Sequence, residues 1–143
     1  MTVTAKFRYL EHTADAKFQA FGATLEEAFA NAALAVASLM WDPAGVGAVR
    51  RETVHVGGND LKQLLLAFLE EILYLLDTRE FLLQGVEDIR IFPGRKGYEL
   101  EAVFAGDTGI GKHEIFGDVK AITYYDMRIE TGDTPLVQVV VDM

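Results

Sequence analysis

Apolar and polar residues alternate in two short stretches near the start of the chain. Residues 6–10 and residues 16–21 each place aromatic or small residues on one side and charged or amide residues on the other. A period of two is typical of a β-strand that covers a core with one face. The sequence therefore predicts two short strands, which residues 11–15 connect.

Two longer segments have their apolar residues at helical spacing. The first, residues 25–40, follows a capping box formed by Thr24 and Glu27 and ends before an Asp-Pro pair. The second, residues 61–76, follows the capping pair Asn59-Asp60 and carries a broad stripe of leucines. Both segments are predicted to be amphipathic helices that bury one side.

The remaining segments return to a period of two. Residues 53–56, 98–104 and 119–130 alternate, whereas residues 136–141 are almost entirely apolar. A continuous apolar strand is typical of a position that is covered on both faces. The proline and glycines of residues 93–97 predict a hairpin connection.

This order of elements predicts the fold class. Helices gathered early and strands gathered late indicate an α+β layered protein. We expect one domain over residues 1–143, built as a two-layer sandwich in which two helices pack on one face of a mixed β-sheet. No internal repeat or low-complexity linker divides the chain.

Composition and charge narrow the possible functions. Half of the residues are apolar, 24% are charged and the net charge is −9, which is a globular profile that repels phosphate backbones. No apolar run approaches the roughly 18 residues of a membrane span, and no secretory signal pattern opens the chain. The absence of cysteine excludes disulfides and thiolate metal sites and fits a cytoplasmic protein.

One glycine-rich segment resembles a phosphate-binding loop. Residues 106–112 have the glycine and lysine spacing of a P-loop and follow a predicted strand. The next residue is His113, although magnesium ligation requires serine or threonine there, and a strand rather than a helix is expected to follow. This departure favours a connecting loop over a nucleotide-binding site.

Two other groups of residues are candidates for catalysis or metal binding. Glu11, His12 and Asp15 lie within five residues, and the final strand delivers Asp142 beside the carboxylate of Met143. If Asp15 lay alongside, the site would consist of oxygen ligands, which suit Ca²⁺ or Mg²⁺. Alternatively, His12 is a structural hydrogen-bonding residue and the chain end is solvated.

A third candidate is a polar strand face. Lys120, Tyr124 and Asp126 fall at alternate positions and would share one side of a regular strand. Such a face serves either as a recognition surface or as an ordinary exposed surface, and the second interpretation is favoured from the residues alone.

Several separated blocks of the chain resemble the archease family. They cover the chain in order: Tyr9–Asp15, Thr24–Phe29, Lys112–Glu114 with Val119–Tyr124, and the terminal Val141–Met143. One departure is Tyr125, where the family usually has histidine, so a role for an imidazole is not expected there.

The resemblance implies an accessory protein without turnover of its own. Archeases act on the RtcB-type RNA ligase, which joins RNA ends that carry a 2′,3′-cyclic phosphate, as in tRNA splicing. They are thought to promote guanylylation of the active-site histidine of the ligase and its multiple turnover. The resemblance thus implies a ligase partner, a cytoplasmic location and no stable direct binding to nucleic acid.

The resemblance also implies a divalent-metal site. Its ligands carry over to Asp15, Asp142 and Met143, with Ca²⁺ as the first expectation and Mg²⁺ or Mn²⁺ as alternatives. We expect strand 7–10 to lie beside the last strand, so that Asp15 meets the chain end. Two other functions stay open, a metal-dependent enzyme that uses these aspartates with His12 or His113, and a general protein chaperone.

Overall fold

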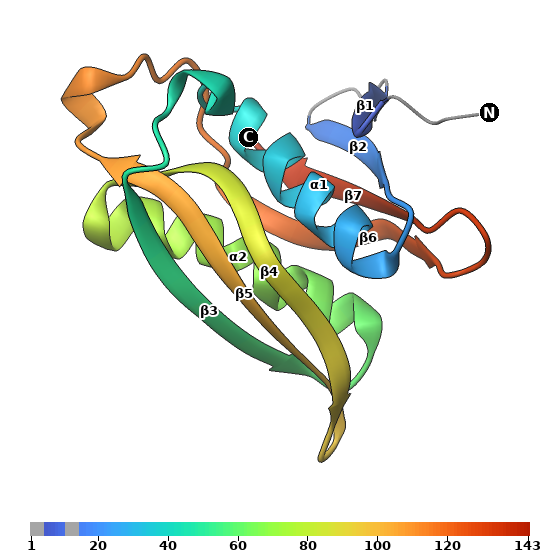
Figure 1. Ribbon diagram of the computed structural model, residues 1–143. Helices are drawn as coiled ribbons and strands as arrows, with labels where there is room; N and C mark the ends of the chain where they lie inside the picture. The colour runs from blue at the N-terminus through green and yellow to red at the C-terminus, as the bar shows by residue number, and fades with distance from the viewer. Residues whose placement is uncertain (1–4, 11–14) are drawn as a thin grey trace.

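The computed structural model describes residues 5–10 and 15–143 (Figure 1). Short 3₁₀ turns lie at Pro43–Gly45 and Ile110–Lys112. The helices and strands, in chain order, are β1 (Phe7–Leu10), β2 (Ala16–Phe21), α1 (Leu25–Ser38), β3 (Arg50–Gly58), α2 (Leu61–Arg79), β4 (Phe81–Gly94), β5 (Gly97–Thr108), β6 (Ala121–Glu130) and β7 (Leu136–Asp142).

The strands form two sheets, one in the order β1-β2-β7-β6 and the other in the order β3-β5-β4. Every pair of neighbouring strands in the described part of the chain is antiparallel. The predicted α+β class is confirmed, but the expected single mixed sheet is instead a pair of antiparallel sheets. The reason is that the connection through α1 leads from β2 into the second sheet, and the chain returns to the first sheet only at β6.

Each helix contacts both sheets, so the helices join the two halves of the molecule. Helix α1 packs on β2 and β4, and α2 packs on β3 and β6 (Figure 1). The aromatic rings of Phe29, Phe68 and Phe104 form a continuous chain through the core, with centroids 6.2 Å and 5.5 Å apart. Trp41 is fully buried, and its indole N–H donates to the Leu83 carbonyl at 2.9 Å, which satisfies its polar atom.

The helix starts are those that the sequence predicts. The Thr24 hydroxyl accepts from the Glu27 amide at 3.1 Å, and the Glu27 carboxylate accepts from the Ala23 amide at 3.1 Å. Asp60 caps α2 by accepting from the Gln63 amide at 2.8 Å. These bonds satisfy amides that have no partner inside the helix.

The end of α2 extends beyond the predicted limit of residue 76. The helix continues to Arg79, and Glu80 then takes a left-handed conformation with φ of 50°. This residue reverses the chain, so β4 begins immediately at Phe81. In the part of the chain that the structure describes, no helix combines the length and apolar composition needed to cross a bilayer.

The glycine-rich segment at residues 106–112, which includes the last residues of β5, is not a P-loop. Strand β5 continues to Thr108, and the next regular element after the short 3₁₀ turn is β6 rather than an α-helix. A Cβ at Gly106 would lie 2.0 Å from the Leu82 carbonyl oxygen of the neighbouring strand. Gly106 is therefore required for the close approach of two strands, which explains a glycine here without any phosphate.

Candidate functional site

The two candidate aspartates lie at the same end of the first sheet, where β2 begins and β7 ends. Ala16 lies opposite Val141 in the antiparallel pair. Continuing this register by one residue sets Asp15 across from Asp142. The prediction that strand 7–10 neighbours the last strand is wrong, because β2 lies between β1 and β7.

The two strands pair because their buried faces match. In β2, Phe18 and Ala20 are fully buried, and in β7 Val137, Val139 and Val141 are fully buried. Strand β1 pairs only with β2, at the edge of the sheet. The predicted proximity of Asp15 to the chain end is therefore reached through β2 rather than through β1.

The last residues are held in place although their side chains are exposed. Val141 is fully buried, and the Asp142 carbonyl accepts from the Lys120 amide at 2.8 Å. The Met143 side chain lies against Gly117, where a Cβ would be 3.6 Å from Met143 Cε. This arrangement is not that of a frayed, solvated end, since both the main chain and a side chain have fixed neighbours.

The candidate metal ligands at this end of the sheet are all oxygen atoms. Two aspartate carboxylates approaching from adjacent strands repel each other unless a positive charge lies between them. Within the described ranges 5–10 and 15–143, no cluster of three or more His, Asp or Glu side chains is arranged to hold a metal ion. Glu11 and His12 lie outside the described residues, so the divalent-metal site at Asp15, Asp142 and Met143 stays a prediction.

Tyr9 fixes the strand that leads into the opening block. Its hydroxyl donates to the Ala35 carbonyl of α1 at 2.9 Å, and its ring packs edge-on against Phe18 with centroids 6.4 Å apart. Burial raises the pKa of Tyr9 to about 12, although a hydrogen bond with Ser38 acts in the opposite direction. The phenol therefore stays a neutral donor that ties β1 to α1.

His113 lies in a different place from the aspartates. It lines a small cavity of about 190 Å³ with Trp41, Asp42 and Phe116, and neither Asp15 nor Asp142 lines this cavity. The His113 Nε2 atom is buried without a hydrogen-bond partner, and Asp107 Oδ2 is 3.9 Å away. The structure therefore does not bring His113 into the carboxylate site.

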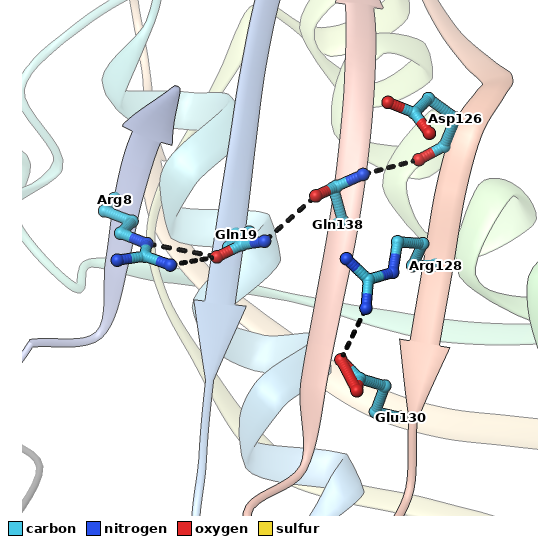
Figure 2. Close-up of polar contacts among 6 residues, drawn as sticks. All are labelled: Arg8, Gln19, Asp126, Arg128, Glu130 and Gln138. Carbon is cyan, nitrogen blue, oxygen red and sulfur yellow. Dashed lines mark hydrogen bonds and ion pairs between the residues drawn. The ribbon is translucent and has the colours of Figure 1, made fainter. Parts of the chain in front are cut away.

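A ladder of polar side chains crosses the first sheet, and the sequence analysis missed it. Arg8 donates to Gln19 at 3.0 and 2.7 Å, Gln19 donates to Gln138 at 2.9 Å, and Gln138 donates to the Asp126 carbonyl at 2.8 Å (Figure 2). Gln19 and Gln138 are only 7% and 3% exposed. The available signal was the presence of a glutamine in the middle of each of two largely apolar strands.

The ladder ends at a bulge in β6. The pairing of β6 with β7 shifts between Thr123 and Arg128, and Asp126 has a φ of 52°. Lys17 Nζ lies 2.6 Å from Asp126 Oδ2, so an ion pair from β2 also holds the bulge. The predicted regular face of Lys120, Tyr124 and Asp126 is thus replaced by an irregular segment.

The bulge exposes two adjacent tyrosines. Tyr124 is 52% exposed and Tyr125 is 68% exposed, whereas neighbours in a regular strand point to opposite faces. Tyr125 is the position at which the sequence departs from the family pattern. The departure therefore falls on the protein surface rather than in the core.

These features define a small α+β protein in which two helices join two antiparallel sheets and two aspartates adjoin the last residue pair of β2 and β7. A model of the archease protein family matches residues 7–143. The chain belongs to the archease family.

Individual relatives agree over nearly the whole length. "Protein archease" of Pyrobaculum neutrophilum is 41% identical over 142 residues, which are 97% of this chain and 96% of the relative. "Protein archease" of Methanosarcina acetivorans is 39% identical, with 96% of each chain covered. The solution structure of protein 1598 from Methanobacterium thermoautotrophicum superposes with a TM-score of 0.81 and 30% identity, covering 96% of this chain and 99% of that one.

Proposed function

We propose that this protein is a non-enzymatic activator of an RtcB-type RNA ligase. In this role it promotes guanylylation of the active-site histidine of the ligase and repeated turnover during tRNA splicing or RNA repair. Membership of the archease family supports the proposal. The observation that carries it is the β2–β7 register, which pairs Ala16 with Val141, the residues next to Asp15 and Asp142.

The functional groups of the activator are the carboxylates of Asp15 and Asp142 with the main-chain oxygens of Met143. These oxygens would hold a divalent cation, with Ca²⁺ preferred and Mg²⁺ or Mn²⁺ as alternatives, because hard cations select oxygen ligands. When bound, the cation supplies a positive charge that offsets the repulsion between the two carboxylates. The buried Val141 and the bond from the Lys120 amide to the Asp142 carbonyl fix the direction in which the Asp142 main chain points.

The position of His113 favours the activator over a metal-dependent enzyme. A general base must lie within hydrogen-bond reach of the group that it deprotonates. His113 lines a cavity that contains neither aspartate. An assay of the purified protein with RNA and metal, but without ligase, should therefore show no ligation or cleavage.

The test is a guanylylation and ligation assay with an RtcB-type ligase. The wild-type protein should accelerate both steps, and Asp15→Asn and Asp142→Asn should each remove the acceleration while leaving thermal unfolding nearly unchanged. Glu130→Gln is the matched control, since Glu130 is an exposed acid at the end of β6, where it pairs across from Leu136 at the start of β7. Full acceleration by either aspartate variant, or none by the wild type, would overturn the proposal.

A further inference from the structure

A groove of about 980 Å³ separates the first part of α1 from β4. Thr24, Asn31 and Leu34 line its helix side, and spacings of seven and three residues place them on one face of the helix. Residues 84–86 and Ile89 line its strand side. The helix rises about 15 Å from Thr24 to Leu34, which is the length of roughly four or five residues of extended chain.

Strand β4 is the outermost strand of the second sheet, and one of its edges lies on the groove side. It pairs with β5 on its other edge. Helix α2 contacts all three strands and covers the face of the sheet, whereas α1 has its main contact with β4, on the side away from β5 (Figure 1). In the described part of the chain, the main-chain hydrogen bonds outside the helices and sheets include none from residues 84–89. Such an edge is a template for pairing with another chain.

Gly85 leaves open space at this edge. Leu83 pairs with Gly106 and Gly85 pairs with Ala105, so Gln84 is an extra residue in β4 at a bulge. Among the described residues, a Cβ on Gly85 would meet nothing within 4 Å, and the φ angle of Gly85 is not positive. Neither a clash nor the main-chain conformation therefore requires glycine here. A glycine inside a strand often marks a place that another main chain approaches closely.

The groove is formed before any partner binds. The Asn31 side chain donates to the Phe21 carbonyl at 2.7 Å, which holds α1 against the end of β2. The Phe21 amide donates to the Lys6 carbonyl at 2.9 Å. On the strand side, the Trp41 indole donates to the carbonyl of Leu83, the residue before the groove begins. Fixed walls lower the entropy cost of binding, because little of the protein has to be ordered.

The charged residues that line the groove favour a basic occupant. They are Lys6, Glu26, Glu27 and Asp133, so three carboxylates face one ammonium group. Within residues 5–10 and 15–143, Glu26 and Asp133 make no ion pair that would neutralise them. Carboxylates repel the phosphates of RNA, and a second copy of the chain has a net charge of −9 and is repelled as a whole. A segment that carries lysine or arginine has the complementary charge.

We propose that the groove between α1 and β4 binds an extended segment of a partner protein that carries lysine or arginine, and that this segment pairs with the edge of β4 over Gly85. In strand addition, main-chain hydrogen bonds give affinity and the side chains at alternate positions give selectivity. The carboxylates select the basic side chains of the segment. Leu34, Val86 and Ile89 offer an apolar surface to the side chains between them.

The groove and the candidate carboxylate site lie at opposite ends of the first sheet. Residues 21–24 of the groove include and follow the end of β2, and residues 133–134 precede the start of β7. Asp15 precedes β2, and Asp142 is the last residue of β7. The inference is therefore separate from the proposed activation of a ligase, and either can fail without the other.

The first part of the experiment uses a defined peptide. The probe is a short fluorescein-labelled peptide of alternating lysine and valine, and fluorescence anisotropy gives its dissociation constant. One comparison peptide has glutamate in place of lysine, and a second has methylated main-chain nitrogens at alternate residues. Both should bind the wild-type protein at least about tenfold more weakly, because the first reverses the charge and the second removes one or more hydrogen bonds.

The second part uses matched variants of the protein. Gly85→Val should weaken binding of the lysine peptide about tenfold without lowering the melting temperature, since valine suits a strand. Gly111→Val is its control, because a Cβ there also meets nothing within 4 Å among the described residues and Gly111 lies in the 3₁₀ turn after β5. Glu26→Lys should weaken binding about threefold at low salt and less at high salt. Glu70→Lys, at an exposed acid of α2, should have no effect.

Three results would overturn the inference. They are the absence of binding of the lysine peptide to the wild type, equal binding of the lysine and glutamate peptides, and wild-type affinity in Gly85→Val. In nuclear magnetic resonance spectra, the amide signals of residues 84–89 should shift when the lysine peptide is added, and shifts confined to other residues would also contradict it. Self-association of the wild type that Gly85→Val abolishes, seen by sedimentation velocity, would assign the groove to a second copy instead.

Discussion

Ala16 of β2 lies directly opposite Val141 of β7, although the two residues are separated by most of the chain. Val141 is fully buried, as are Phe18 and Ala20 further along β2, so the register cannot slip by one residue without turning apolar side chains to the wrong face. Asp15 and Asp142 are the next residues beyond this pair.

Calcium should stabilise the wild-type protein, and the stabilisation should require both aspartates. A ligand that binds only the folded state adds about 2.7 kcal/mol when its concentration is 100 times its dissociation constant. Asp15→Asn and Asp142→Asn should each lose this increment, and the double variant should lose no more than either single one.

Differential scanning calorimetry with Ca²⁺, Mg²⁺ and a chelator measures these effects. Glu130→Gln serves again as the control and should keep the full response. An undiminished calcium response in Asp15→Asn would show that the ion binds elsewhere.

Breaking the polar ladder should destabilise the fold more than an ordinary surface change. Gln138→Ala removes a buried acceptor from Gln19 and a donor to the Asp126 carbonyl, and an unsatisfied buried polar group costs about 1–3 kcal/mol. Urea unfolding measures the loss. Gln84→Ala, at a half-buried glutamine of β4, is the comparison and should cost less. Equal losses of unfolding free energy in the two variants would mean that the ladder makes no special contribution to stability.

Replacing each of two glycines of residues 106–112 by alanine should change the stability of the fold by different amounts. A Cβ at Gly106 would lie 2.0 Å from the Leu82 carbonyl oxygen, whereas a Cβ at Gly111 would meet nothing within 4 Å. Gly106→Ala should therefore cost about 1–3 kcal/mol or more, in the range of overpacked sites, and Gly111→Ala should be nearly neutral. Thermal unfolding of both variants provides the measurement. The opposite order would indicate that Gly111 has a role beyond chain connection.

Replacing Glu71 should change the pH dependence of stability. Burial, with a smaller contribution from the Glu70 carboxylate, raises the pKa of Glu71. A raised carboxyl pKa means that the unfolded chain loses its proton first, so wild-type stability falls as pH rises from the unfolded pKa through the folded one. Glu71→Gln should be more stable than the wild type at pH 7 and should lose this advantage below about pH 4.

Unfolding by urea at several pH values tests this expectation. Glu70→Gln is the neighbouring control and should give a smaller gain, since it removes only the lesser cause. A Glu71→Gln advantage that is independent of pH would point to packing rather than ionisation.

The sequence by itself determined the local elements and which acidic residues are candidates for a site. Periods of two and of about 3.6 residues identified the strands and both helices. Thr24 and the pair Asn59-Asp60 marked the helix starts, and the structure assigns the second cap to Asp60. These signals are local, since caps and side-chain faces depend on residues a few positions apart. The acidic residues at positions 15 and 142 were visible for the same reason.

Only the tertiary structure decided which strands became neighbours. Strand β2 rather than β1 pairs with β7, and the strands divide into two sheets instead of one. Gln19 and Gln138 are 119 residues apart in the chain but share a hydrogen bond. Such pairings follow from the summed fit of buried faces from distant segments, which no local period encodes. The bulge at Asp126 has the same origin, because it depends on Lys17 and Gln138 from two other strands.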